Sequence, residues 1–159
     1  MFNVENYSGT KEENYVLVIK QLQALLAGEK NVVANLSNAS ALLNQFLQEV
    51  NWVGFYLLED EQLVLGPFQG LPACIRIPLG KGVCGSAAKE QKTYRVSDVH
   101  QFPGHIACDA ATHSEIVLPI YKDGKVFGVL DIDSPITDRF DEIDEKMLKE
   151  FVKALEELL

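Results

Sequence analysis

The chain has 159 residues, of which 47% are hydrophobic and 23% charged, so a single domain of this length can bury a core without disulfides or metal ions. Its 23 acidic residues against 14 lysines and arginines give a net charge of −9, which argues against a nucleic-acid or anionic-membrane partner because both require a basic surface. The longest apolar stretches, such as residues 116–121, are too short to cross a bilayer, and the N-terminal segment lacks the pattern of a signal peptide. We therefore expect a cytoplasmic protein.

Apolar periodicity predicts helices at both ends of the chain and strands between them. A first helix follows the capping box at residues 10–13 and ends at Gly28, and a second covers the apolar positions from Val32 to Val50. A glycine-rich loop at 80–85 enters a short helix at 86–90, and a last helix begins near Asp141. The predicted strands are, in chain order, 52–58, 63–65, 74–77, 94–96, 115–121 and 125–133. We infer an α+β fold with a central antiparallel six-stranded sheet and the N- and C-terminal helices packed on one side.

The last two strands form the clearest predicted hairpin, joined by residues 122–124. A three-residue loop would place Tyr121 opposite Lys125 and Glu115 opposite Asp131. Because side chains alternate across a sheet, one face would then carry Glu115, Asp131, Asp133, Val117, Val129 and Phe127. Carboxylates beside an apolar face are costly unless they bind something, and their repulsion should raise at least one pKa.

Two features would weaken this prediction. A two-residue loop would put Glu115 on the other face of the sheet. The carboxylates could also lie at strand ends in water, with no ligand at all.

Three cysteines in a chain of this kind are either inert core residues or reactive thiols. Cys108 lies in the weakly periodic segment 97–113, a length typical of functional loops, and an imidazolium at His105 would lower the pKa of its thiol. Cys74 opens a predicted strand after a proline, and Cys84 lies in the flexible glycine-rich loop. Such positions favour reactive thiols, while simple core packing is the alternative interpretation.

A zinc site is a further alternative for the long loop, which holds His100, His105, Cys108 and His113. The chain contains no CxxC pair and no HExxH motif, so the spacing is not that of a common zinc site and we expect no metal.

Trp52 and Tyr56 lie four residues apart in the first predicted strand, so their side chains point to the same face. Aromatic residues at this spacing usually belong to a core. They can also surround a methyl group beside a reactive cysteine.

Five separated motifs follow one another between residues 51 and 134: Asn51-Trp52-Val53-Gly54-Phe55-Tyr56, Leu65-Gly66-Pro67-Phe68-Gln69-Gly70, Ile77-Pro78-Leu79-Gly80-Lys81-Gly82-Val83-Cys84-Gly85, Phe102-Pro103-Gly104-His105-Ile106-Ala107-Cys108-Asp109 and Gly128-Val129-Leu130-Asp131-Ile132-Asp133-Ser134. Together they closely resemble the free methionine-(R)-sulfoxide reductases, which are single-domain enzymes with the GAF fold. The resemblance implies that residues 1–159 form one GAF-like catalytic domain that reduces free L-methionine-(R)-sulfoxide to L-methionine.

The resemblance also implies roles for the cysteines. Cys108 would attack the sulfoxide sulfur and become a sulfenic acid, which a second cysteine would convert to an intramolecular disulfide. Cys74 is the first choice as this partner, with Cys84 relaying or substituting. Thioredoxin would reopen the disulfide as the external reductant, and no cofactor is required.

The resemblance further assigns the carboxylates and aromatic residues. Glu115, Asp131 or Asp133 would protonate the departing oxygen, and the acids would hold the substrate ammonium. Trp52 and Tyr56 would shape a closed pocket around the methyl-sulfoxide end.

A homodimer is a candidate assembly. The competing function is a GAF sensor that binds a small ligand such as a cyclic nucleotide. A protein that only binds a ligand, however, does not need three cysteines.

Overall fold

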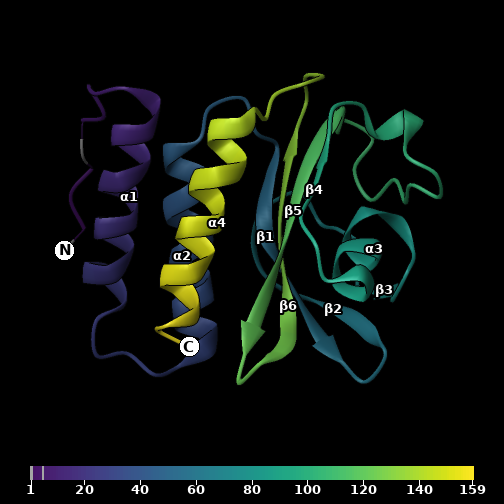
Figure 1. The fold of residues 1–159 in the computed structure, drawn as a ribbon, viewed down its shortest axis with the longest axis horizontal. Helices are drawn as coiled ribbons and strands as arrows, with labels where there is room; N and C mark the ends of the chain where they lie inside the picture. Colours follow the sequence, from purple (N-terminus) through teal and green to yellow (C-terminus); the bar gives the residue numbers. More distant parts are fainter. Residues whose placement is uncertain (1, 5) are drawn as a thin grey trace.

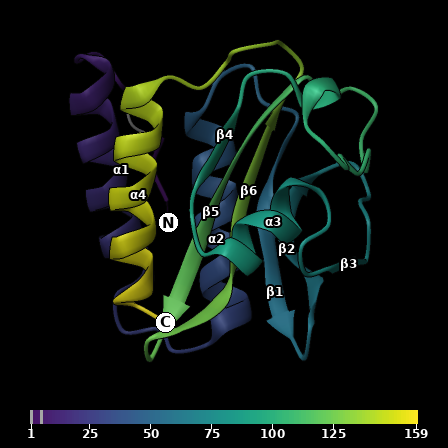
Figure 2. The same ribbon diagram turned by 45° about the vertical axis from the view of Figure 1, so that its right-hand side comes forward.

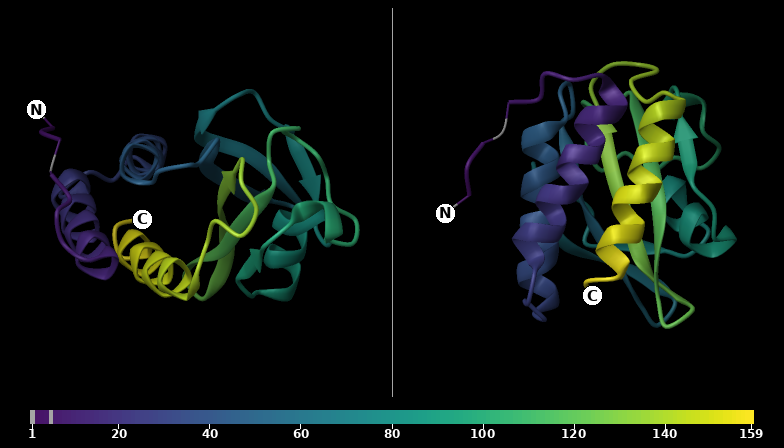
Figure 3. Two further views of the ribbon diagram at one scale, coloured as in Figure 1. Left: turned by 90° about the horizontal axis from the view of Figure 1, so that it is seen from above. Right: turned by 60° about the vertical axis from the view of Figure 1, so that its left-hand side comes forward.

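Helices cover both faces of a central sheet in the computed structural model, which describes residues 2–4 and 6–159. Helices α1 (Lys11–Leu26), α2 (Val32–Phe46) and α4 (Glu142–Glu156) pack on one face, as Figures 1 and 3 show. The short helix α3 (Gly82–Glu90) lies against the opposite face (Figure 2). The N- and C-terminal helices therefore share one side of the sheet, as predicted.

The sheet is antiparallel throughout, with strand order β3-β2-β1-β6-β5-β4. This confirms the predicted α+β class and the number of strands. The strands are β1 (Trp52–Glu59), β2 (Gln62–Gly70), β3 (Arg76–Pro78), β4 (Tyr94–Val96), β5 (Ser114–Lys122) and β6 (Lys125–Ser134). A 3-10 turn, η1 (Val99–Gln101), interrupts the long loop between β4 and β5. No helix in the described part of the chain is both long and apolar enough to span a membrane.

The sheet separates two apolar cores. The larger core lies between the sheet and helices α1, α2 and α4, and includes Phe55, Leu118 and Phe151. The smaller core lies under α3 and includes Trp52 and Tyr56, which share a face as predicted. Alternation along β1 explains this division, because Val53 and Phe55 face the helices while their neighbours face α3.

Two element boundaries differ from the prediction around the glycine-rich segment. Helix α3 begins at Gly82, four residues earlier than expected, so Cys84 lies in a helix and not in a flexible loop. Gly80 and Gly82 have positive φ values of 82° and 62°, which turn the chain into the helix. Strand β3 begins at Arg76, so Cys74 precedes it.

The β5–β6 hairpin has a shorter loop than predicted. Lys122 pairs with Lys125, so the loop is the two residues Asp123 and Gly124, both with positive φ. This conformation matches the right-handed twist of the strands, which is why two-residue loops of this type are favoured. The predicted three-residue loop and its pairings are therefore wrong.

A β-bulge restores the face that the short loop would have changed. The register shifts between Ile120 and Tyr121, and beyond this point Glu115 pairs with Asp133 and not with Asp131. The extra residue keeps Glu115 on the same face as both aspartates. Phe127 is the exception, because at the bulge it packs against the helical core instead.

Candidate active site

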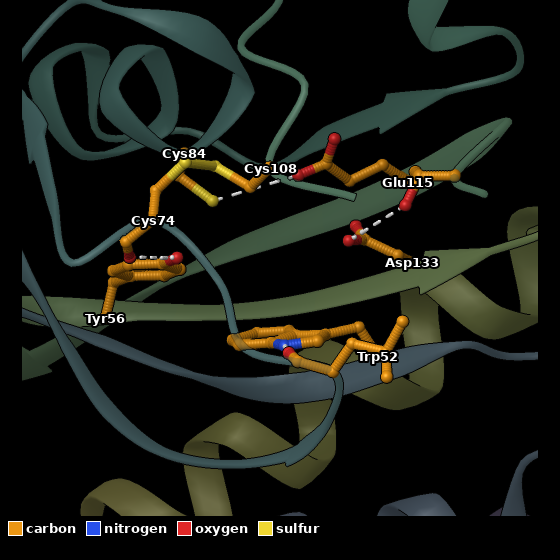
Figure 4. The surroundings of a disulfide bond; sticks show 9 residues. Trp52, Tyr56, Cys74, Cys84, Cys108, Glu115 and Asp133 are labelled. Carbon is orange, nitrogen blue, oxygen red and sulfur yellow. Dashed lines mark hydrogen bonds between the residues drawn. A yellow bond between two sulfur atoms is a disulfide. The ribbon is translucent and has the colours of Figure 1, made fainter. Parts of the chain in front are cut away.

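A pocket lies on the α3 side of the sheet, between β1, β6, β5, helix α3 and the long loop after η1. Its wall combines aromatic, sulfur-containing and acidic side chains, as Figure 4 shows. The loop closes one side with Ile106 and Cys108. Of the residues predicted as site residues, this pocket is lined by Trp52, Tyr56, Cys84, Cys108, Glu115, Asp131 and Asp133.

Cys74 is joined to the pocket through a disulfide with Cys108. The two Cα atoms are 5.4 Å apart, although the residues are separated by 34 positions in the chain. Tyr56 helps to hold this segment, since its hydroxyl donates a hydrogen bond to the Cys74 carbonyl at 2.8 Å. The bond joins the pair of cysteines that the family resemblance put first, and both are half-buried.

Cys84 is the free thiol of the site. It is 5% exposed and lies in α3, so its interpretation as an exposed or mobile cysteine is wrong. Its Sγ lies 3.8 Å from Glu115 Oε1, with the thiol as donor. Burial raises the pKa of this thiol well above its usual value, and the charges of Asp131 and Glu115 raise it further, so Cys84 is held as a protonated thiol.

Three carboxyl groups meet beside these sulfur atoms. Glu115 and Asp133 face each other across β5 and β6, and Asp131 lies two residues along the same strand. Burial is the main cause that raises the pKa of Glu115 to about 8, and the charge of Asp133 is the second cause. Burial, followed by the neighbouring carboxylate, also raises the pKa of Asp131 and of Asp133 well above the usual value. These shifts agree with the predicted rise of at least one pKa, with burial as the larger cause and repulsion between the acids as the smaller one.

A buried carboxylate elsewhere in the chain shows what these acids lack. Asp144, in the first turn of α4, is fully buried and accepts hydrogen bonds from Lys11, Arg139 and the Tyr15 hydroxyl at 2.5–3.3 Å. Among the described residues, no lysine or arginine forms an ion pair with the pocket acids. One carboxylate oxygen of Asp131 and one of Asp133 are buried without a hydrogen-bond partner in the described part of the chain. The pocket is therefore suited to a ligand that carries a positive charge.

Three further residues position Asp133, and the sequence analysis did not assign them. Thr112 Oγ1 lies 3.3 Å from Asp133 Oδ2 and forms a hydrogen bond with it. The side-chain amide of Asn51 donates to Thr112 Oγ1 at 3.1 Å and to Asp109 at 3.0 Å. Asn51 and Asp109 both belong to the motifs quoted above, so those motifs could have indicated that the two residues belong to the site.

Aromatic rings form the wall opposite the cysteines (Figure 4). Trp52 stacks on Tyr56 with ring centroids 5.8 Å apart and on Phe68 at 5.1 Å, and its indole nitrogen donates to the Leu71 carbonyl at 3.2 Å. Gly54 makes this stacking possible, because a Cβ there would lie 2.8 Å from the Trp52 ring. Phe68 supports the Trp52 ring by this stacking and does not itself line the pocket, and the sequence analysis did not assign it.

The histidines of the long loop do not have the surroundings that the predicted activation of Cys108 requires. Burial, followed by the charge of His100, lowers the pKa of His105 and so disfavours the imidazolium that was expected to activate Cys108. Cys108, one of the four candidate zinc ligands of this loop, is bonded to Cys74 in this structure and so offers no thiolate to a metal ion. Within the described residues, the one group with metal-ligand spacing is Cys84, Glu115 and Asp131, which belongs to the pocket itself.

Comparison with known proteins identifies the family. A model of the GAF domain matches residues 36–159. Free methionine-R-sulfoxide reductase of Escherichia coli (strain K12) is 53% identical over 149 residues, covering 94% of this chain and 90% of that protein.

Solved structures give the same answer. The structure of fRMsr of Staphylococcus aureus in its reduced form has a TM-score of 0.90 at 55% identity, and the match covers 100% of this chain and 99% of that one. The free methionine-R-sulfoxide reductase from Neisseria meningitidis, in complex with its substrate, has a TM-score of 0.94 at 43% identity, with 99% and 95% covered. This chain therefore belongs to the free methionine-R-sulfoxide reductase family of GAF-domain proteins.

Proposed function

We propose that this protein reduces free L-methionine-(R)-sulfoxide to L-methionine with the thiol of Cys108. The observation that carries this proposal is the Cys74–Cys108 disulfide in the wall of an acidic, aromatic pocket. A ligand-binding sensor needs no such bond, whereas a thiol reductase forms one in every cycle. The naming of close relatives as free methionine-R-sulfoxide reductases supports the same substrate.

The pocket matches the charge distribution of a free amino acid. The substrate ammonium would lie against Asp131 and Asp133, whose unpartnered oxygens would accept its hydrogen bonds. Trp52 and Tyr56 would contact the methyl-sulfoxide end. A methionine residue within a protein has no free ammonium group, so it could not compensate the buried carboxylates. This difference accounts for a preference for the free amino acid.

The chemistry divides into two steps that balance. The Cys108 thiolate attacks the sulfoxide sulfur, the oxygen passes to Cys108, and methionine leaves while a sulfenic acid forms. Glu115 would donate the proton that the sulfoxide oxygen takes up, because its pKa of about 8 keeps it protonated at neutral pH. The Cys74 thiol then attacks the sulfenic sulfur, water leaves, and the disulfide forms.

An external dithiol would complete the cycle. Thioredoxin would supply two electrons and two protons, which convert the disulfide back to the thiols of Cys74 and Cys108. No step requires a bound cofactor. Thiols that cycle in this way depend on a reducing compartment, so we also propose a cytoplasmic location.

Single-turnover methionine release tests this function. The pre-reduced protein is mixed with free L-methionine-(R)-sulfoxide or with the S epimer, with a Cys108→Ser variant in parallel. We expect about one methionine per protein from the R epimer only, and none from the variant, since one thiol provides one turnover. Absence of methionine from both epimers, with the thiols titrated as reduced, would contradict the proposal.

A further inference from the structure

Exposed apolar side chains lie close in sequence to both cysteines of the Cys74–Cys108 disulfide. Leu71 and Ile75 are 65% and 69% exposed, and they lie three residues before and one residue after Cys74. Ile106, 36% exposed, lies two residues before Cys108. We call these three side chains the apolar rim. The disulfide, which Figure 4 shows, joins the two segments that carry them, so the rim adjoins the bond.

The two segments that carry the apolar rim also lack charged residues. Residues 70–75 and 102–108 contain no lysine, arginine, aspartate or glutamate, although 23% of the chain is charged and its net charge is −9. Both segments lie at the surface, with Pro72, Pro103 and Ala107 also exposed. Exposed leucine and isoleucine side chains gathered around one bond are costly in water unless a partner covers them.

The two segments are held from beneath. The Leu71 carbonyl accepts a hydrogen bond from Trp52, and the Cys74 carbonyl accepts one from Tyr56. These bonds attach the backbone to the pocket wall while the side chains of Leu71 and Ile75 point away from the pocket lining. Leu71 and Ile75 are thus fixed in position without lining the pocket, whereas Ile106 belongs to both the rim and the pocket wall.

We infer that the apolar rim is the docking surface for the dithiol protein that reduces the Cys74–Cys108 disulfide, a partner of the thioredoxin type with an apolar surface around its reactive cysteine. This inference rests on the proposed function, because the bond must be reduced in each cycle. The partner's thiolate attacks one sulfur, the S–S bond breaks and a mixed disulfide forms. The partner's second thiol then breaks that bond, so the partner is oxidised and both cysteines are reduced. A protein that brings its thiolate to a sulfur within the rim must cover the rim, whereas a small dithiol reaches the half-buried sulfur without doing so.

The test compares a protein reductant with a small one. The protein is first oxidised with diamide, so that the disulfide forms without any substrate, and its reduction is followed through the fluorescence of Trp52, the single tryptophan. Reduction by a bacterial thioredoxin, kept reduced by its reductase and NADPH, is compared with reduction by dithiothreitol. The variants are Leu71→Ser/Ile75→Ser and, as a matched control, Val33→Ser, which removes an apolar side chain of equal exposure, 65%, on helix α2.

We expect the double variant to lower the second-order rate constant with thioredoxin about 10-fold, with the dithiothreitol rate unchanged, because loss of an interface contact affects only the docked reductant. Val33→Ser should change neither rate. An unchanged thioredoxin rate, or an equal loss with both reductants, would overturn the inference. So would a change from dimer to monomer in the double variant, measured by light scattering, since the rim would then belong to a self-association surface. Methionine release supported by dithiothreitol tests the proposed function separately.

Discussion

Glu115 lies directly opposite Asp133 across strands β5 and β6, and both line the pocket, with Glu115 buried and Asp133 half-buried. Directly opposed side chains in an antiparallel pair are neighbours, so ionisation of either acid raises the pKa of the other. The pair can therefore hold a proton at neutral pH and also attract a cation. These are the two properties that the proposed reaction requires of this side of the pocket.

The pH dependence of the reaction should identify Glu115 as the proton donor. The Glu115 pKa of about 8 predicts that kcat/KM falls as the pH rises above this value, because the acid is then ionised in the free enzyme. Glu115→Gln should lower kcat/KM by about 100-fold and remove this alkaline limb. Steady-state rates between pH 6 and pH 10 measure both effects.

Glu59→Gln is the matched control for this variant, since Glu59 is exposed at the end of β1. It should leave the pH profile unchanged. An alkaline limb that persists in Glu115→Gln would assign the proton to another group.

Stability should also depend on pH through these acids. A carboxyl whose pKa is higher in the folded protein favours folding at low pH, and this contribution is lost as the pH rises from the unfolded pKa to the folded one. For Glu115 the window runs from 4.5 to about 8. Asp131→Asn removes one of the repelling charges, so at pH 8 it should raise the free energy of unfolding by about 1–3 kcal/mol.

Chemical denaturation at pH 5 and pH 8 measures this change. Glu61→Gln, which removes an exposed acid in the β1–β2 turn, provides the comparison. If Asp131→Asn gains no more stability at pH 8 than at pH 5, the pocket acids are not under mutual repulsion.

Substitution of Cys74 and substitution of Cys108 should stop the catalytic cycle at different steps. Cys74→Ser should still release about one methionine per protein, because the nucleophile is intact, but turnover with thioredoxin should fall about 100-fold or more. Its Cys108 sulfenic acid should accumulate and react with dimedone, which mass spectrometry detects. Cys84→Ser should still form the Cys74–Cys108 bond and give no dimedone adduct. An adduct in that variant would instead support a relay through Cys84.

Trp52 should act on substrate binding more than on the chemical step. Its ring forms the pocket wall and has no acidic or nucleophilic group to offer the reaction, so Trp52→Phe should raise KM by about 3–10-fold with little change in kcat. Tyr121→Phe, a change to a half-buried ring outside the pocket, is the aromatic control. A large fall in kcat at constant KM would place Trp52 in the chemistry itself.

Much of the fold follows from local pattern. Apolar periodicity predicted the terminal helices, and the strand segments predicted an antiparallel α+β sheet, because these signals depend on residues close together in the chain. The common face of Trp52 and Tyr56 followed from strand alternation in the same way. The motifs between residues 51 and 134 indicated the family before any tertiary contact was known.

Only the tertiary structure decided how the site is assembled. The observed two-residue loop by itself would put Glu115 on the other face of the sheet. The bulge at the register shift between Ile120 and Tyr121 returns Glu115 to the predicted face, since one extra residue in a ladder reverses every side chain beyond it. Cys84 reads as a loop thiol in the sequence, yet packing of α3 against the sheet buries it beside Glu115. Sequence pattern therefore determined the elements and the family of this protein, whereas register and long-range packing determined which thiols and carboxyls meet, because those contacts join residues that no local signal connects.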